Sequence, residues 1–174
     1  MDKLIIQKYP KFNDELTFDD IVELEILFEE KETEDCNYSK EIIDFYTPYY
    51  KSYKKEKYWY NSCDNMMNCY PNEETLRENL FFDFVPDGVI NWIEKHSDGD
   101  MSTHCVLTKE LIEELCGLCW CVGNEKYIAE AAFPSEIDDY DFIYFRTIFK
   151  LLMVLPHVIR ETDFENYEVV CNLV

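Results

Sequence analysis

Three cysteines near the middle of the chain have the residue type and close spacing that metal sites use. Cys116, Cys119 and Cys121 form the pattern C-x2-C-x-C. Structural zinc requires four ligands, usually in two pairs separated by a loop, and a second pair is missing here, although His104 and Cys105 lie upstream. Within a helix, positions 116 and 119 share one face and position 121 points away. We therefore expect buried thiols, and neither a metal nor another cofactor.

A cysteine and a histidine could also act as a nucleophile and its base. Cys105 could pair with His104 or His96, but neighbours in sequence generally point apart, and no glycine motif for an oxyanion hole accompanies them. His157 follows Pro156 in an apolar segment, where a core or surface histidine is the default. The chain has no G-x-x-x-x-G-K, G-x-G-x-x-G or H-E-x-x-H motif. These observations predict a protein that is not an enzyme, and a cysteine- or metal-dependent enzyme ranks last among the alternatives.

The segment DGDMS, residues 98–102, resembles the start of a calcium-binding loop, but its register fails. With Asp98 at the first position, Thr103 takes the place of the turn glycine and Lys109 that of the bidentate glutamate. We predict a polar turn in a helix–loop–helix corner that spans residues 90–115.

Acidic residues dominate the composition. Asp and Glu number 37 against 16 Lys and Arg, which gives a formal net charge of −21 at pH 7. The excess lies in residues 1–36, 73–115 and 116–174, so it is not confined to a tail. Direct binding to nucleic acid or to an anionic membrane needs a positive face, and the composition argues against both. It favours a partner protein with a basic surface.

Acids are interleaved with aromatic residues at the start of the last long helix that the sequence predicts. Asp138, Asp139 and Asp141 cluster there beside Tyr140 and Tyr144. One interpretation is an amphipathic helix start, in which the carboxylates complement the helix dipole and the rings face the core. The other is a carboxylate surface that imitates nucleic-acid phosphates, with the two tyrosines as aromatic anchors. These five residues are the candidate binding site.

The only basic cluster lies in residues 49–60, where Lys51, Lys54, Lys55 and Lys57 are interleaved with aromatic residues. Such a mixture can bind single-stranded nucleic acid. A linker or surface strand whose lysines pair with acids elsewhere is the preferred interpretation. For an anionic small ligand, the candidate cations are these lysines and three arginines, Arg77, Arg146 and Arg160.

Capping residues and the spacing of apolar residues predict most of the secondary structure. Thr17 and Thr108 are expected to be N-caps. Pro48 should end a short helix, and Pro156 should kink the last one. Strands are expected before Pro10 and within residues 165–174, and helices over residues 16–30, 40–46, 71–84, 87–97, 109–122 and 138–159.

The length of 174 residues indicates one domain, residues 1–174, and 47% hydrophobic residues supply a core. With only 4 glycines and 6 prolines, the sequence predicts an α+β fold, mainly helical, in a single compact domain with a few short strands near the termini. The opening MDKLIIQKYPKF has no secretory h-region, and no stretch approaches the roughly 18 apolar residues of a membrane span. We expect a cytoplasmic protein whose 8 cysteines stay reduced.

The sequence between residues 88 and 174 resembles a family of small uncharacterised tailed-phage and prophage proteins. The family runs from an Ile-His-x-Trp segment through an acidic DGVDDC turn to a VTKEQLEELL helix, and its later YDEYYFEDLEDTIEIIEKVL helix is similar to residues 140–159. Residues 161–169 resemble its usual exit. Asn91 replaces the family's histidine, the family's YWRK opening has no clear counterpart, and residues 1–57 match nothing comparable. The first part of the match involves Ile90, Trp92, Asp98, Gly99, Cys105, Thr108, Lys109, Glu110, Leu111 and Leu115.

This resemblance implies a viral or prophage accessory protein with a helical core in residues 58–174, and it carries no chemistry of its own. Together with the charge, it leads to the hypothesis of a non-enzymatic acidic protein in the host cytoplasm that binds and inhibits a host protein. In one version the target is a defence protein and the chain mimics nucleic acid. The alternative, motivated by the 16% aromatic content, is a protein that sequesters a small ligand or nucleotide signal. The sequence leaves the identity of the partner and the oligomeric state open.

Overall fold

The first strand, β1 (Lys3–Pro10), contributes buried side chains to two separate cores. Leu4 and Ile6 are fully buried in the larger of two cores, whereas Tyr9 is buried in the smaller one. Successive side chains of a strand point to opposite faces, so β1 is covered on both sides. The structure is a computed structural model that describes residues 3–53, 75–122, 126–134 and 142–174.

The described strands form one sheet in the order β2-β1-β5-β4-β3, and each pair of neighbours is antiparallel. The first and last strands of the chain are therefore adjacent, and Ile6 lies opposite both Phe81 and Cys171. Pairing of the two ends of the chain closes the fold. The strands after β1 are β2 (Glu78–Phe84), β3 (Gly99–Asp100), β4 (His104–Val106) and β5 (Tyr167–Leu173).

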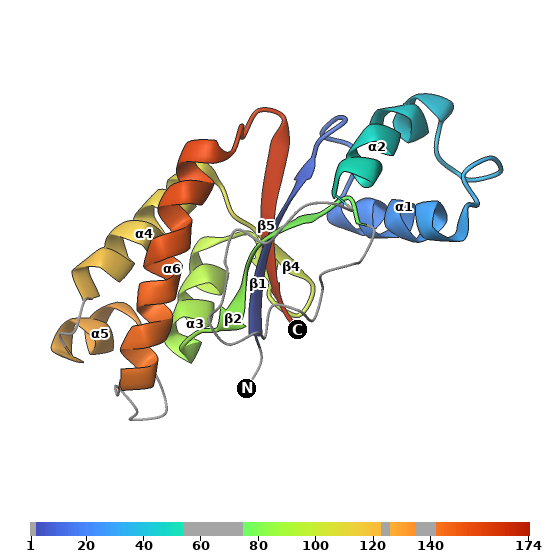
Figure 1. Cartoon of the computed structure of the whole chain (residues 1–174). Helices are drawn as coiled ribbons and strands as arrows, with labels where there is room; N and C mark the ends of the chain where they lie inside the picture. The colour runs from blue at the N-terminus through green and yellow to red at the C-terminus, as the bar shows by residue number, and fades with distance from the viewer. Residues whose placement is uncertain (1–2, 54–74, 123–125, 135–141) are drawn as a thin grey trace.

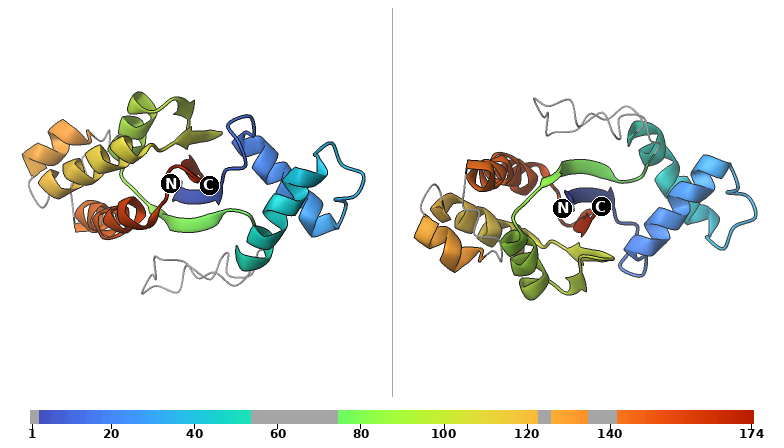
Figure 2. Two further views of the ribbon diagram at one scale, coloured as in Figure 1. Left: turned by 90° about the horizontal axis from the view of Figure 1, so that it is seen from above. Right: turned by 90° about the horizontal axis from the view of Figure 1, so that it is seen from below.

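Helices cover both faces of this sheet, as Figures 1 and 2 show. Val169 and Cys171 of β5 belong to the larger core, beneath four helices, and Val170 between them belongs to the smaller core, beneath two. The larger group is α3 (Asp87–His96), α4 (Lys109–Val122), α5 (Lys126–Ala132) and α6 (Phe142–Glu161), and the smaller is α1 (Phe18–Glu30) and α2 (Lys40–Tyr53).

Local signals at the ends of α1 work as the sequence predicts. Thr17 caps the helix, because its hydroxyl accepts from the N–H of Asp20 while the Asp20 carboxylate accepts from the N–H of Thr17. At the other end, Lys31 adopts a left-handed conformation with φ 59° and its N–H closes the last turn. The predicted cap is confirmed, and it fixes where the acidic face of α1 begins.

The prediction that Pro48 ends the second helix is wrong, because α2 continues through it to Tyr53. Proline removes a backbone donor and costs a helix interior about 3 kcal/mol. Two buried tyrosines outweigh that cost: Tyr46 and Tyr50 lie on either side of the proline in the smaller core. Tyr46 also ties α2 to the end of β1, since its hydroxyl donates to the carbonyl of Pro10 at 2.8 Å.

The helix predicted over residues 71–84 is also wrong where the structure describes it, because residues 78–84 form strand β2. Phe81 and Phe82 are both buried on this strand, which a single helical face would not predict. Its register with β1 shifts at Ile6–Gln7, where a bulge lets the two strands stay paired. The short apolar run in residues 78–84 is compatible with either a helix or a strand, and pairing with β1 makes it a strand.

The predicted helix–loop–helix corner at residues 90–115 contains a strand pair, so that interpretation needs correcting as well. Between α3 and α4 the chain forms the β3–β4 hairpin, and β4 pairs with β5 in the sheet. The α+β class, mainly helical, is confirmed. Of the five described strands, two lie near the termini, as predicted, and the other three lie in the middle of the chain. No helix in the described part of the chain is both long and apolar enough to cross a bilayer.

Candidate functional site

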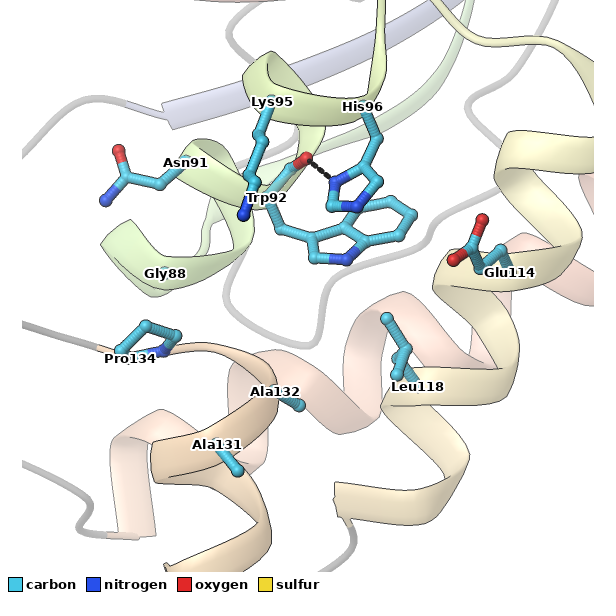
Figure 3. Close-up of a pocket in the computed structure, with 10 residues that line it drawn as sticks. All are labelled: Gly88, Asn91, Trp92, Lys95, His96, Glu114, Leu118, Ala131, Ala132 and Pro134. Carbon is cyan, nitrogen blue, oxygen red and sulfur yellow. Dashed lines mark hydrogen bonds between the residues drawn. The ribbon is translucent and has the colours of Figure 1, made fainter.

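A pocket of about 400 Å³ opens between α3, α4 and the end of α5. Its apolar wall includes Leu118 of α4 and Ala132 of α5, and polar side chains from α3 and α4 line its opening (Figure 3). A cavity of this size is at the lower end of the range that small-molecule sites occupy. It is a concave site that the described residues offer for a ligand.

The periodicity of α3 presents one set of its residues to the core and another to the pocket. Val89 and Ile93 are fully buried under the sheet, while Lys95 is exposed at the pocket. Gly88 allows α3 to approach the chain after α5, because a Cβ at this position would lie 2.4 Å from the backbone carbon of Phe133. Close packing at this glycine therefore forms one end of the pocket.

Trp92 is the central side chain of the site. It is only 9% exposed, with Phe133 edge-on to its ring at 6.5 Å and His96 stacked against it at 4.4 Å. Figure 3 shows the indole N–H edge facing the space between the three helices. An indole N–H is a donor only, and no acceptor for it occurs among the described residues. The indole N–H lies at the open pocket, so it can donate to water or to an acceptor on a ligand.

The imidazole of His96 is held in one orientation. Its Nδ1 lies 2.8 Å from the carbonyl oxygen of Trp92. A carbonyl only accepts, so Nδ1 carries the proton and Nε2 is the nitrogen left for a ligand or water. The stacked indole and this hydrogen bond together fix the ring over the pocket.

The charged groups at the opening come from two helices. Lys95 belongs to α3 and Glu114 to α4, and neither makes an ion pair with another described residue. Among the described residues that line the pocket there is no Ser, Thr or Cys to act as a nucleophile. The arrangement can bind and orient a small molecule, with Lys95 and His96 as its titratable nitrogen groups.

The cysteines that the sequence singled out occupy three different environments in α4. Cys119 is 1% exposed, Cys116 is partly buried and Cys121 is exposed. Burial raises the pKa of the Cys119 thiol to about 12, which keeps it protonated and a poor ligand. Within the described ranges, no three His, Cys, Asp or Glu side chains come together as a metal site would require.

The possible nucleophile–base pairs are separated by the sheet and the helices. His104 stacks on Phe18 of α1 at 4.7 Å, whereas its neighbour Cys105 is fully buried opposite Cys171. The Cys171 thiol lowers the pKa of Cys105 to about 7, yet no histidine adjoins it in a described hydrogen bond. His96 is at the pocket, and His157 is exposed on α6 beside Arg160.

Residues 98–102 were predicted to form a polar turn, and they lie at the turn of the β3–β4 hairpin. Asp100 accepts a hydrogen bond from the N–H of Ser102 at 2.7 Å and its carbonyl accepts from Thr103 at 2.9 Å. The hydrogen bonds from Ser102 lower the pKa of the Asp100 carboxyl. This carboxylate stabilises the turn between β3 and β4.

The predicted acidic binding cluster is only partly visible. Asp138, Asp139, Tyr140 and Asp141 lie outside the described residues. Tyr144 is buried, 6% exposed, and its hydroxyl donates to the carbonyl of Phe133 at 3.1 Å. Its ring therefore packs in the core and is not presented to a partner.

The cations proposed for an anionic ligand do not meet at the pocket. Arg77 is bound to Glu25, and Arg160 lies beside His157 and Glu161. Neither these arginines nor Arg146 lines the pocket, and lysines 54, 55 and 57 lie outside the described residues. Lys95, which the sequence did not single out, is the cation at this site. Lys95 lies three residues after Trp92 on a short predicted helix, and this spacing was the signal in the sequence that could have placed the two side chains together.

A second surface of note is the outward face of α1. Asp19, Glu23 and Glu30 are exposed along it at helical spacing, and Ile26 between them is 47% exposed. Tyr38 bonds Glu23 at 2.7 Å and fastens this face to the loop before α2. The acids of α1 therefore form a continuous stripe with an apolar residue in its middle.

Comparison with known proteins adds no relative: no family model, no curated protein and no solved structure matches the chain. The resemblance of residues 88–174 to tailed-phage proteins stays a prediction. Function is therefore inferred from the chain's own residues.

Proposed function

We propose that this chain is a non-enzymatic acidic binding protein of viral or prophage origin, and that it binds and inhibits a host protein with a basic surface in the host cytoplasm. The observation that carries the proposal is the acidic stripe on α1, defined by Asp19, Glu23 and Glu30 around the exposed Ile26. Carboxylates give fast, steered association, and a central apolar residue supplies burial at the contact.

The position of the acids on α1 supports a binding role over a purely structural one. Glu29 and Glu30 are exposed in the last turn, which itself holds no basic residue, and Glu32 follows after the C-cap Lys31. The C-terminal end of a helix carries partial negative charge, so acids there destabilise the helix. Charge kept at a cost to stability is typical of surfaces selected for function.

The stripe is also held in place before any partner arrives. The Tyr38 hydroxyl lies within hydrogen-bond distance of both Asp20 and Glu23, at 3.0 and 2.7 Å, and can donate its single proton to either carboxylate. The backbone N–H of Thr17 further lowers the pKa of Asp20 and keeps it ionised. A surface with ordered charges loses less conformational entropy when it binds.

The test compares capture from a cleared bacterial lysate by three forms of the protein. The first is the natural chain, the second carries Asp19→Asn, Glu23→Gln and Glu30→Gln, and the third removes the same charge elsewhere. That matched control carries Glu110→Gln, Glu161→Gln and Glu165→Gln, all at exposed positions.

The proposal expects a basic protein that the natural chain and the control retain at low salt, that the α1 variant loses, and that high salt releases. If all three forms capture the same proteins to the same extent, the α1 surface is not the binding surface. A fourth variant with Asp138→Asn, Asp139→Asn and Asp141→Asn then decides whether those acids carry the binding. In the nucleic-acid-mimic version, added duplex DNA displaces the captured protein.

A further inference from the structure

The pocket of α3, α4 and α5 is built from other helices than the acidic stripe, which lies on α1. We propose that it binds a small organic monocarboxylate with an apolar body. The evidence is a buried tryptophan whose N–H faces the cavity without an acceptor, a lysine at the opening, and an apolar opposite wall.

Two donors at the pocket are available to an acceptor from outside the protein. Trp92 is more than nine-tenths buried, its indole N–H faces the cavity, and the described residues supply no acceptor for it. Lys95 contributes an ammonium group from the next turn of the same helix, also without an ion pair among the described residues. An ammonium and an indole N–H are both donors only. A carboxylate satisfies both, and its bond to the ammonium is charge-assisted.

The charge of the site limits the ligand to one negative charge. Lys95 is the single lysine or arginine among the described lining residues, and Glu114 stands on the other helix across the opening. A phosphate or dicarboxylate would place a second negative charge near Glu114 in a protein of net charge −21. A monocarboxylate matches the one available cation.

The remaining surface of the pocket sets the body of the ligand. Leu118, Ala131, Ala132 and Pro134 contribute its opposite side, and none of them carries a side-chain donor or acceptor. A volume of about 400 Å³ holds roughly 13 atoms of water size. An aromatic or branched aliphatic acid of about ten non-hydrogen atoms fits this volume and buries its body against that side.

The test uses three probes with one apolar body and different charge: phenylacetate, phenylacetamide and benzylamine. Binding is followed by the indole N–H signal of Trp92 in ¹⁵N-labelled full-length protein, assigned by its loss in Trp92→Phe. The expected result is a saturable shift of this signal by phenylacetate with a Kd of about 1 mM or tighter, and a weaker response to the other two. Equal affinity for phenylacetamide, preference for benzylamine, or no shift of the Trp92 signal overturns the proposal.

Two substitutions at the opening give a second, independent readout. Lys95→Met keeps the length of the side chain and removes its charge, and we expect phenylacetate to bind about tenfold more weakly, the loss of one charge-assisted hydrogen bond. Glu114→Gln should tighten binding, because it removes the opposing charge. Lys109→Met is the control, since Lys109 pairs with Glu113 outside the pocket. Unchanged affinity in Lys95→Met, or an equal loss in Lys109→Met, overturns the proposal, and the Trp92 signal of each free variant reports whether it has folded.

Discussion

The guanidinium of Arg77 donates two hydrogen bonds to the carboxylate of Glu25, from Nη2 to Oε2 at 2.8 Å and from Nε to Oε1 at 3.0 Å. Glu25 belongs to α1 and Arg77 lies just before β2, so this pair joins the smaller helical layer to the edge of the sheet. Oε1 of Glu25 also accepts the backbone N–H of Leu76 at 2.8 Å. The side chains are only 8% and 20% exposed.

We predict that Glu25→Gln lowers the free energy of unfolding by about 3 kcal/mol, because it leaves the Arg77 charge buried without a counterion. Gln keeps an oxygen that can accept from the backbone N–H groups of Leu76 and Arg77, so the loss of stability reports the lost charge. Urea denaturation measures it. Glu113→Gln is the control: its partner Lys109 is half exposed and 3.9 Å away, and the change should be below about 1 kcal/mol. Equal losses of unfolding free energy in the two variants would show that the buried ion pair contributes no more to stability than the exposed one.

Two glycines should respond to alanine in opposite directions. At Gly88 an added Cβ would lie 2.5 Å from the carbonyl oxygen of Phe133, so Gly88→Ala must push α3 away and should destabilise the protein by about 2 kcal/mol or more. At Gly117, in the middle of α4, an added Cβ meets nothing within 4 Å. Gly117→Ala should therefore stabilise by about 0.5–1 kcal/mol. Chemical denaturation of both variants decides, and a stabilising Gly88→Ala would contradict the close packing at the pocket.

Cysteine alkylation should separate two thiols that are two residues apart. At pH 8, iodoacetamide should modify the exposed Cys121 quickly, whereas Cys119 should stay protected because it is buried and its pKa is raised to about 12. Peptide mass spectrometry with fragmentation locates the label. Protection of Cys119 should disappear in denaturant. Equal labelling in the native protein would mean that the end of α4 opens readily.

Stability should rise when the pH falls from 7.5 to 5.5, and Glu168 is a specific cause. Burial raises its pKa above the ordinary value of 4.5, so the folded state binds a proton more readily than the unfolded state, and stability is lost as pH rises through the folded pKa. The lowered pKa of Asp20 acts only below its ordinary value of 3.8, outside this window. The Cys171 thiol lowers the pKa of Cys105 to about 7, so the stability that Cys105 contributes is lost as pH falls through 7, and this opposes part of the gain. Repulsion among 37 acids acts in the same direction as Glu168.

Glu168→Gln isolates that contribution. The variant keeps an acceptor for the hydroxyl of Tyr9 and should show a smaller gain in thermal midpoint between pH 7.5 and 5.5 than the natural chain. Glu165→Gln, at a neighbouring exposed position, should keep the natural pH dependence. A natural chain that melts clearly lower at pH 5.5 would show instead that carboxylates with lowered pKa values dominate.

Features with local causes could be predicted from the sequence, and features with distant causes could not. The cap at Thr17 depends on a residue three positions away, and the same holds for Thr108, whose hydroxyl accepts from Leu111 at 3.2 Å. Strand β2 depends on β1, more than seventy residues earlier, because Ile6 aligns with Phe81. A short apolar run fits both periods, and only that distant partner decides which one forms.

The pocket could not be predicted for the same reason. Trp92 and Lys95 are three residues apart and therefore neighbours on the surface of α3, but the wall opposite them comes from Leu118 and Ala132. Whether an indole N–H finds an acceptor is decided by the packing of three helices, which no spacing within α3 reports. The cysteine pattern shows the reverse case, because positions within one helix are enough to show that Cys121 points away from Cys119.

The acids at the two ends of α1 should affect stability with opposite signs. Glu29→Gln with Glu30→Gln removes negative charge from the C-terminal end, where the dipole is negative and the C-cap Lys31 is the adjoining basic residue. The pair should raise the free energy of unfolding by about 0.3–1 kcal/mol at low ionic strength, and by less in high salt. Asp19→Asn at the first turn of the same helix is the matched control and should lower it by a similar amount. If the α1 stripe is the binding surface, Glu29→Gln with Glu30→Gln also weakens binding of the captured host protein while the fold becomes more stable. A variant that is stabilised and binds as tightly as the natural chain would assign these two glutamates to neither fold nor function.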